Sequence, residues 1–90
     1  MRIRARVDAN QKEIVSKLRG IGCSVLHTHQ LGKGAPDIIV GYNNLNYLIE
    51  IKDGDKPKAQ QKLTQDEVKF QSEWKGNYYV INCFDKLRDI

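Results

Sequence analysis

The stretch Pro36-Asp-Ile-Ile-Val-Gly-Tyr-Asn-Asn-Leu-Asn-Tyr-Leu-Ile-Glu-Ile-Lys52 contains two apolar runs joined by an asparagine-rich turn. Residues 38–42 and 47–52 have the length and the β-branched and aromatic content of strands. Asparagines between two such runs predict an antiparallel hairpin. Its turn centres on Asn43 and Asn44, and its length stays open because Leu45 and Asn46 precede the second run.

Three charged residues, Asp37, Glu50 and Lys52, lie on these two strands. Side chains alternate along a strand, so Glu50 and Lys52 share one face and the isoleucines between them face the other way. The hairpin can place Asp37 beside Glu50. Ionised groups are costly to bury, so they are usually paired, bound to a metal or used in chemistry.

Two converging carboxylates predict a site for a divalent cation. Carboxylate oxygens suit Mg²⁺ or Mn²⁺, which take few protein ligands and keep several waters. Such a metal could polarise a scissile phosphate and activate water, while Lys52 orients the nucleophile and stabilises phosphate charge. The backbone carbonyl of Ile51 is a further possible ligand. The alternative is an exposed salt bridge between Glu50 and Lys52, worth at most ~1 kcal/mol, with Asp37 capping a turn.

The remaining pattern predicts one helix before the hairpin and another after it. Ile14, Val15 and Leu18 form an apolar stripe on the first helix, and Thr64 with Glu67 forms a capping box at the start of the second. The expected elements are a helix from about Asp8 to Arg19, a strand Cys23–Thr28, the two hairpin strands, a helix from Thr64 that Gly76 closes, a strand Tyr78–Cys83 and a short helix capped by Asp85. The order αβββαβ predicts an α/β fold with a mixed central sheet flanked by helices.

Length and composition fit a single domain, residues 1–90, with 40% hydrophobic and 29% charged residues. The net charge of +4 is compatible with a polyanionic partner such as nucleic acid. Chains this short often form homodimers. We expect buried free thiols at Cys23 and Cys83, no membrane segment, no signal peptide and a cytoplasmic location.

Gly34-x-Pro36-Asp37 followed by Glu50-x-Lys52 resembles the signature of the PD-(D/E)XK nuclease superfamily. The surroundings are similar to the stand-alone VRR-NUC domain, a relative of Holliday-junction resolvases. The N-terminal helix, the two hairpin strands and the Leu-Thr-x-x-Glu helix follow in family order over nearly the whole chain. The resemblance departs at Glu67, where many of these nucleases carry a glutamine.

The resemblance implies a restriction-endonuclease-like core and a metal-dependent endonuclease that cuts DNA, most specifically four-way junctions, as a homodimer. It implies that Asp37 and Glu50 bind Mg²⁺ or Mn²⁺ with the Ile51 carbonyl, that Lys52 is the catalytic lysine and that Glu13 is an acidic partner from the first helix. Glu67 and Gln71 are possible supporting residues.

Basic residues flank the proposed site and are the natural DNA phosphate contacts, namely Lys33, Lys56, Lys58, Lys62, Arg2, Arg4 and Arg6. His27 and His29 fit ordinary polar positions at a strand end better than metal ligands. Trp74, Tyr78 and Tyr79 could stack on bases but fit core or dimer contacts better. Two other functions stay open: a non-catalytic DNA-binding module, and a subunit of a larger nuclease complex.

Overall fold

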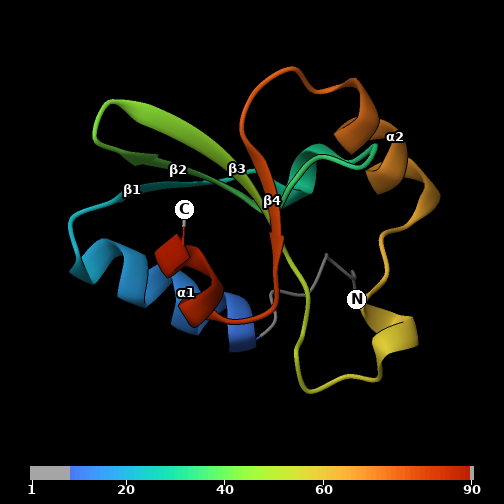
Figure 1. The fold of residues 1–90 in the computed structure, drawn as a ribbon, viewed down its shortest axis with the longest axis horizontal. Coiled ribbons are helices and arrows are strands. Elements are labelled where there is room, and N and C mark those ends of the chain that lie inside the picture. Colours follow the sequence, from blue (N-terminus) through green and yellow to red (C-terminus); the bar gives the residue numbers. More distant parts are fainter. Residues whose placement is uncertain (1–8, 90) are drawn as a thin grey trace, which may run out of the picture.

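The computed structural model describes residues 9–89 and has a four-stranded mixed sheet with one α-helix on each face (Figure 1). The elements are α1 (Ala9–Gly20), β1 (Ser24–His27), β2 (Ile38–Tyr42), β3 (Leu45–Ile51), α2 (Gln65–Glu73) and β4 (Tyr78–Ile81), with 3₁₀ turns at His29–Leu31, Lys58–Gln61 and Phe84–Asp89. This order confirms the predicted αβββαβ arrangement and the α/β fold class. Arg2, Arg4, Arg6 and the expected helix cap Asp8 lie outside the described residues.

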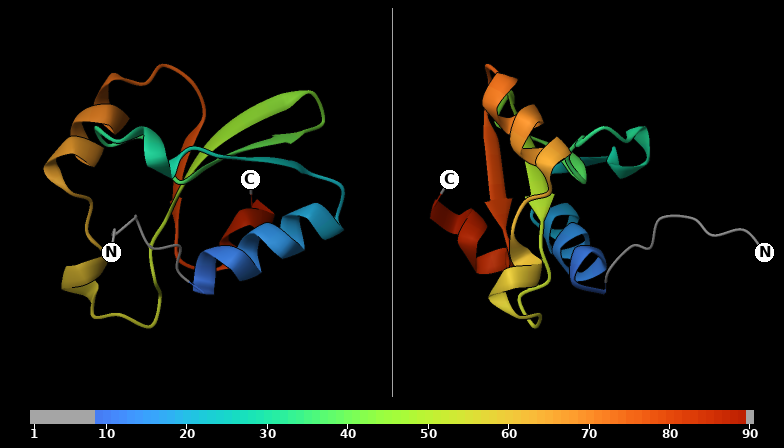
Figure 2. Two further views of the ribbon diagram at one scale, coloured as in Figure 1. Left: turned by 180° about the vertical axis from the view of Figure 1, so that it is seen from behind. Right: turned by 90° about the vertical axis from the view of Figure 1, so that its right-hand side faces the viewer.

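The strands lie in their order along the chain, β1-β2-β3-β4. β2 pairs antiparallel with β1 and with β3, whereas β4 pairs parallel with β3. The parallel pairing follows from the crossover through α2, which returns the chain to the end of the sheet from which β3 starts. Figures 1 and 2 show α1 and the C-terminal 3₁₀ turn at one end of the molecule and α2 at the other.

The β2–β3 turn has two residues, because β3 already begins at Leu45. Asn43 and Asn44 both have positive φ, 54° and 65°. A two-residue turn of this kind matches the right-handed twist of the flanking strands, and asparagine tolerates the left-handed conformation better than most residues. The turn fixes the register that sets Ile38 opposite Ile49.

The core lies on the face of the sheet that α1 covers. Ile14, Val15 and Leu18 of α1 are buried there, as the apolar stripe predicts. They pack with the side chains of one face of the sheet, namely Ile38, Val40, Ile49, Ile51 and Ile81. Glu50 and Lys52 belong to the opposite face, here called the polar face, which also carries apolar side chains such as Ile39 and Leu48.

α2 starts as predicted but ends earlier. Thr64 accepts a hydrogen bond from the Glu67 amide, and Glu67 accepts one from the Thr64 amide, which completes the capping box. The helix ends at Glu73 with Trp74 as its cap, so the expected closure at Gly76 is wrong. Trp74 has an extended backbone, and the centroid of its ring lies 5.5 Å from that of Phe70, so the helix ends three residues before the glycine.

The C-terminal segment also differs from the prediction. β4 ends at Ile81, so Cys83 lies beyond the strand, and Asp85 belongs to a 3₁₀ turn rather than to an α-helix. Cys23 and Cys83 are free thiols, as expected, but they are half-buried rather than buried. None of the helices within residues 9–89 has the length and apolar character needed to cross a membrane.

Candidate active site on the polar face of the sheet

The start of β2 is fixed by Thr28, a buried residue that sequence reasoning missed. The Thr28 hydroxyl donates to the Pro36 carbonyl at 2.7 Å, and the Thr28 amide donates to the Asp37 carbonyl at 2.9 Å. A buried hydroxyl with a strong acceptor holds the backbone firmly. The backbone at Asp37 is therefore fixed, and its side chain lies on the polar face.

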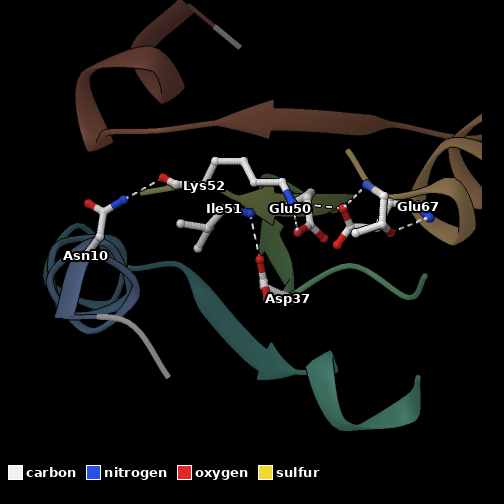
Figure 3. Close-up of polar contacts among 7 residues, drawn as sticks. Asn10, Asp37, Glu50, Ile51, Lys52 and Glu67 are labelled. Carbon is white, nitrogen blue, oxygen red and sulfur yellow. Dashed lines mark hydrogen bonds and ion pairs between the residues drawn. The ribbon is translucent and has the colours of Figure 1, made fainter. Parts of the chain in front are cut away.

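Asp37 is tied to β3 through the Ile51 amide, which donates to Asp37 Oδ2 at 2.7 Å (Figure 3). The Lys52 amide donates to the Ile81 carbonyl of β4 and the Leu48 amide to Asn77 just before β4, so the Ile51 peptide faces β2. Extending the β2–β3 register by two residues sets Pro36 opposite Ile51. Proline has no backbone N–H. Pro36 therefore donates no hydrogen bond to the Ile51 carbonyl, which leaves that oxygen available as a metal ligand.

Glu50 is the most deeply buried charged residue of this face, with 4% of its surface exposed. Its Oε2 atom lies 3.5 Å from Lys52 Nζ, whereas its Oε1 atom is buried without a partner among residues 9–89. Burial, and then the charges of Asp37 and Glu67, raise the pKa of Glu50 to about 9. Even beside the Lys52 ammonium the carboxylate is costly to ionise here, and a bound divalent cation would favour its charged form.

Lys52 lies between two carboxylates, as Figure 3 shows. Its ammonium group contacts Glu67 Oε1 at 2.8 Å and Glu50 at 3.5 Å. Burial alone would lower the pKa of Lys52, but the bond to Glu67 and the charge of Glu50 outweigh it and raise that pKa. Lys52 therefore stays charged, and its ammonium group is held at a fixed point.

Glu67 connects the lysine to the first turn of α2. Burial raises the pKa of Glu67, but the hydrogen bonds from Lys52 and from the Thr64 amide outweigh this and lower it. The same oxygen, Oε1, accepts both bonds. The capping box that the sequence predicts thus also positions the lysine, a role that the helix pattern alone does not reveal.

The charges of the cluster favour a bound cation. Burial raises the pKa of Asp37, and the bond from the Ile51 amide offsets this only in part. Three acidic side chains but only one ammonium group lie in the cluster, and a buried oxygen of Glu50 is unpartnered among the described residues. No group of three or more His, Cys, Asp or Glu side chains in the described part of the chain is arranged to hold a metal. The residues of this cluster that could hold Mg²⁺ or Mn²⁺ are Asp37, Glu50 and, through its carbonyl, Ile51.

Glu13 does not reach this cluster. Its side chain is 64% exposed and pairs with Lys17 at 3.2 Å, one helical turn away. The residue of α1 that reaches the site strand is Asn10, whose amide donates to the Lys52 carbonyl at 2.8 Å (Figure 3). Glu13 lies on the outer side of α1 because Gln11, Ile14 and Leu18 occupy the side that is buried.

The other predicted residues lie around the cluster. Gln71 is exposed on α2, one turn beyond Glu67, and His29 lies in a 3₁₀ turn rather than in β1 with His27. The lysines expected to contact DNA are all exposed, namely Lys33, Lys56, Lys58 and Lys62. In the segment with the last three, Gln61 donates to the Lys56 carbonyl and accepts from the Asn82 amide.

The comparison with solved structures supports the resemblance at the level of the fold. A chain described as a VRR_NUC domain matches with a TM-score of 0.67 and 19% sequence identity, over 88% of this chain and 86% of the other. No protein-family model matches the sequence, and no curated protein matches it. The chain therefore has the fold of a VRR_NUC domain, and its chemistry depends on the cluster described above.

Proposed function

We propose that this protein is a metal-dependent DNA endonuclease that hydrolyses phosphodiester bonds at the Asp37–Glu50–Lys52 cluster. The observation that carries the proposal is the buried Glu50 carboxylate, which shares the polar face with Asp37 and Lys52 and has an unpartnered oxygen among the described residues. A purely structural salt bridge would be exposed or fully paired. The VRR_NUC fold adds independent support.

Each residue has a defined part in the proposed reaction. Asp37 and Glu50 would hold Mg²⁺ or Mn²⁺ together with the Ile51 carbonyl, and the bound metal supplies charge stabilisation and an activated water. Lys52 presents its ammonium group to the phosphate, where negative charge develops in the transition state. Glu67 keeps that group in place through the 2.8 Å contact. Asn10 and Thr28 hold the two strands on which these groups lie.

The proposed substrate is branched DNA, bound chiefly through its phosphates. The chain has a net charge of +4, and the exposed lysines Lys33, Lys56, Lys58 and Lys62 lie in the loops next to the site strands. Phosphate contacts set the position of DNA but do not read its sequence. A homodimer would present two sites to a symmetric four-way junction, which is the most specific form of the proposal.

Cleavage assays on the purified chain test the proposal. Linear, flapped and four-way-junction DNA are incubated with the protein in Mg²⁺, Mn²⁺ or EDTA, and Lys52→Ala is compared with the wild type. We expect cutting only with metal, preference for the junction and loss of at least about 100-fold in rate for the variant.

The outcomes separate the alternatives. Equal cutting by the wild type and Lys52→Ala would show that the active site is not at Lys52. Cutting without junction preference would contradict the branched substrate but not the nuclease activity. Binding to DNA without cleavage would identify a non-catalytic module. Cleavage that needs an added chain would identify a subunit of a larger nuclease, and sedimentation of the chain alone tests the homodimer.

A further inference from the structure

Tyr78 and Tyr79 are adjacent in β4 but lie on opposite faces of the sheet. The register sets Tyr78 beside Leu48 and Tyr79 beside Ile49. Tyr78 therefore shares the polar face with Glu50 and Lys52, whereas Tyr79 lies on the face of the core, with its ring 6.1 Å from that of Tyr47. Only one of these two tyrosines faces the proposed active site.

The Tyr78 hydroxyl is buried and has no hydrogen-bond partner among residues 9–89. Its ring lies 6.0 Å from that of Phe70 in α2, which covers this part of the face. Phenylalanine would fill the same space without leaving a polar group unsatisfied. Packing alone therefore does not explain a tyrosine at this position.

The Tyr78 hydroxyl lies close enough to the acidic side chains of the proposed site to be affected by their charges. Burial raises the pKa of Tyr78, and the charges of Glu50, Glu67 and Asp37 raise it further, with Glu50 the strongest of the three. Glu50 also has a buried and unpartnered oxygen, Oε1, within the described part of the chain. A donor without an acceptor and an acceptor without a donor thus lie on adjacent strands, on the same face.

We propose that Tyr78 is a positioning residue for the metal ligand Glu50, to which its hydroxyl donates a hydrogen bond once metal is bound. The inference rests on the proposed metal site. Residues that hold a ligating carboxylate from outside the coordination sphere fix its orientation and typically contribute a factor of about 10 to 100 in metal affinity. Lys52 contacts only Oε2 of Glu50, which leaves acceptor capacity for a second donor.

Tyr78→Phe tests this role, with Tyr79→Phe as the matched control. The two variants lose the same hydroxyl from neighbouring residues on opposite faces. Titration with Mn²⁺, followed by calorimetry, measures metal affinity without any need for cleavage. We expect Tyr78→Phe to bind Mn²⁺ at least about tenfold more weakly than the wild type, and Tyr79→Phe to bind as the wild type does.

Thermal unfolding in EDTA shows whether weaker Mn²⁺ binding by Tyr78→Phe comes from the lost positioning of Glu50 or from a less stable fold. We expect Tyr78→Phe to unfold at the wild-type temperature or above, because it removes an unsatisfied buried hydroxyl. Unchanged Mn²⁺ affinity in Tyr78→Phe, weaker affinity in both variants alike, or a loss of stability in EDTA that accounts for the weaker binding would each overturn the inference.

The proposed metal site is checked in the same titration with Asp37→Asn. If the wild type binds Mn²⁺ and Asp37→Asn does not, the metal site stands and the result for Tyr78→Phe decides the role of Tyr78 alone. If the wild type binds no Mn²⁺, both the metal site and the role of Tyr78 are overturned.

Discussion

Lys52 places a single ammonium group between the carboxyl groups of Glu50 and Glu67. The shortest contact, 2.8 Å, is to Glu67, the residue at which the sequence departs from the glutamine of similar nucleases. A carboxylate at this position adds a negative charge next to the proposed metal site. We therefore expect the carboxylate of Glu67 to act mainly on the affinity of the site for the cation.

We expect Glu67→Gln to weaken Mn²⁺ binding by about three- to tenfold, because a negative charge near the cation is lost. The amide oxygen can still accept from the Thr64 amide, so α2 keeps its cap. Calorimetric titration measures the change. Glu73→Gln, at the exposed end of α2, removes the same charge away from the site and should bind as the wild type does. Equal affinity in all three proteins would contradict the expectation.

Glu50 should make the metal-free protein less stable as the pH rises. Its pKa is about 9 when folded, against 4.5 ordinarily, so between these values the folded protein binds one proton more than the unfolded chain. The free energy of unfolding then falls as the pH rises from about 4.5 to about 9. The raised pKa of Asp37 acts in the same direction.

Glu50→Gln removes this titration and should raise the unfolding temperature at pH 8 in EDTA. The expected gain is at least about 4–8 °C, the shift that ~1 kcal/mol produces in a domain of this size. Thermal unfolding between pH 5 and pH 9 measures it. If the variant loses stability with pH as steeply as the wild type, another group causes the pH dependence.

At the scale of the elements, Gly34 sets how closely α2 approaches the loop before β2. Its φ is +81°, and a Cβ atom there would meet the backbone carbonyl of Asp66 and lie 2.9 Å from the Glu67 amide. The glycine thus lets the loop lie against the first turn of α2. This contact helps to keep Glu67 beside Lys52.

Gly34→Ala should therefore disturb both stability and the site. Gly32→Ala is a matched control, because Gly32 also has a positive φ, +75°, but a Cβ atom added there would meet no atom within 4 Å. The control should cost about 1–3 kcal/mol, because its φ of 75° and ψ of −173° lie in a region that is essentially restricted to glycine. Gly34→Ala should cost more, since α2 must shift, and should also weaken DNA cleavage. Denaturant unfolding measures the stability of both variants, and equal losses would contradict the role of the contact.

The sequence predicted the elements where local chemistry decides them. The asparagine turn, the capping box at Thr64 and the strand Ile38–Tyr42 are all found, because each depends on neighbouring residues. The end of α2 was missed, since it depends on the stacking of Trp74 on Phe70. Phe70 and Trp74 are one helical turn apart, and such a pair also fits a continued helix, so the pattern does not show where α2 ends.

The site was predictable in part for the same reason. Strand alternation and the hairpin place Glu50, Lys52 and Asp37 together, but the contribution of α1 depends on how that helix lies on the sheet. The sequence favoured Glu13, whereas Asn10 makes the contact. No sequence pattern showed that Thr28 would bind the Pro36 carbonyl or that Tyr78 would share the face of Glu50, because these depend on a loop contact and on the parallel pairing of β4.

At the scale of the whole molecule, the distribution of lysines predicts how DNA binds. Lys56, Lys58 and Lys62 are exposed in the segment between β3 and α2, whereas Lys12 and Lys17 are exposed on α1. Each phosphate contact that is lost should reduce the dependence of affinity on salt. The two groups thus offer a test of which surface meets DNA.

We expect the combined change of Lys56, Lys58 and Lys62 to Gln to weaken DNA binding and to reduce the slope of log affinity against log salt by about 2–3. Fluorescence anisotropy at several salt concentrations, in EDTA to prevent cleavage, measures the slope. The double change of Lys12 and Lys17 to Gln is the control and should alter the slope little. A larger effect in the control would place DNA on the α1 surface.

The most direct test of the central claim is the single-turnover rate of DNA cleavage by Asp37→Asn at saturating Mn²⁺. Asparagine keeps the size of the side chain but weakens the metal ligand, so we expect wild-type cleavage that stops in EDTA and a rate at least about 100-fold lower in the variant. Cleavage by Asp37→Asn at the wild-type rate, or the absence of metal-dependent cleavage by the wild type, would contradict a metal-dependent nuclease site at Asp37, Glu50 and Lys52.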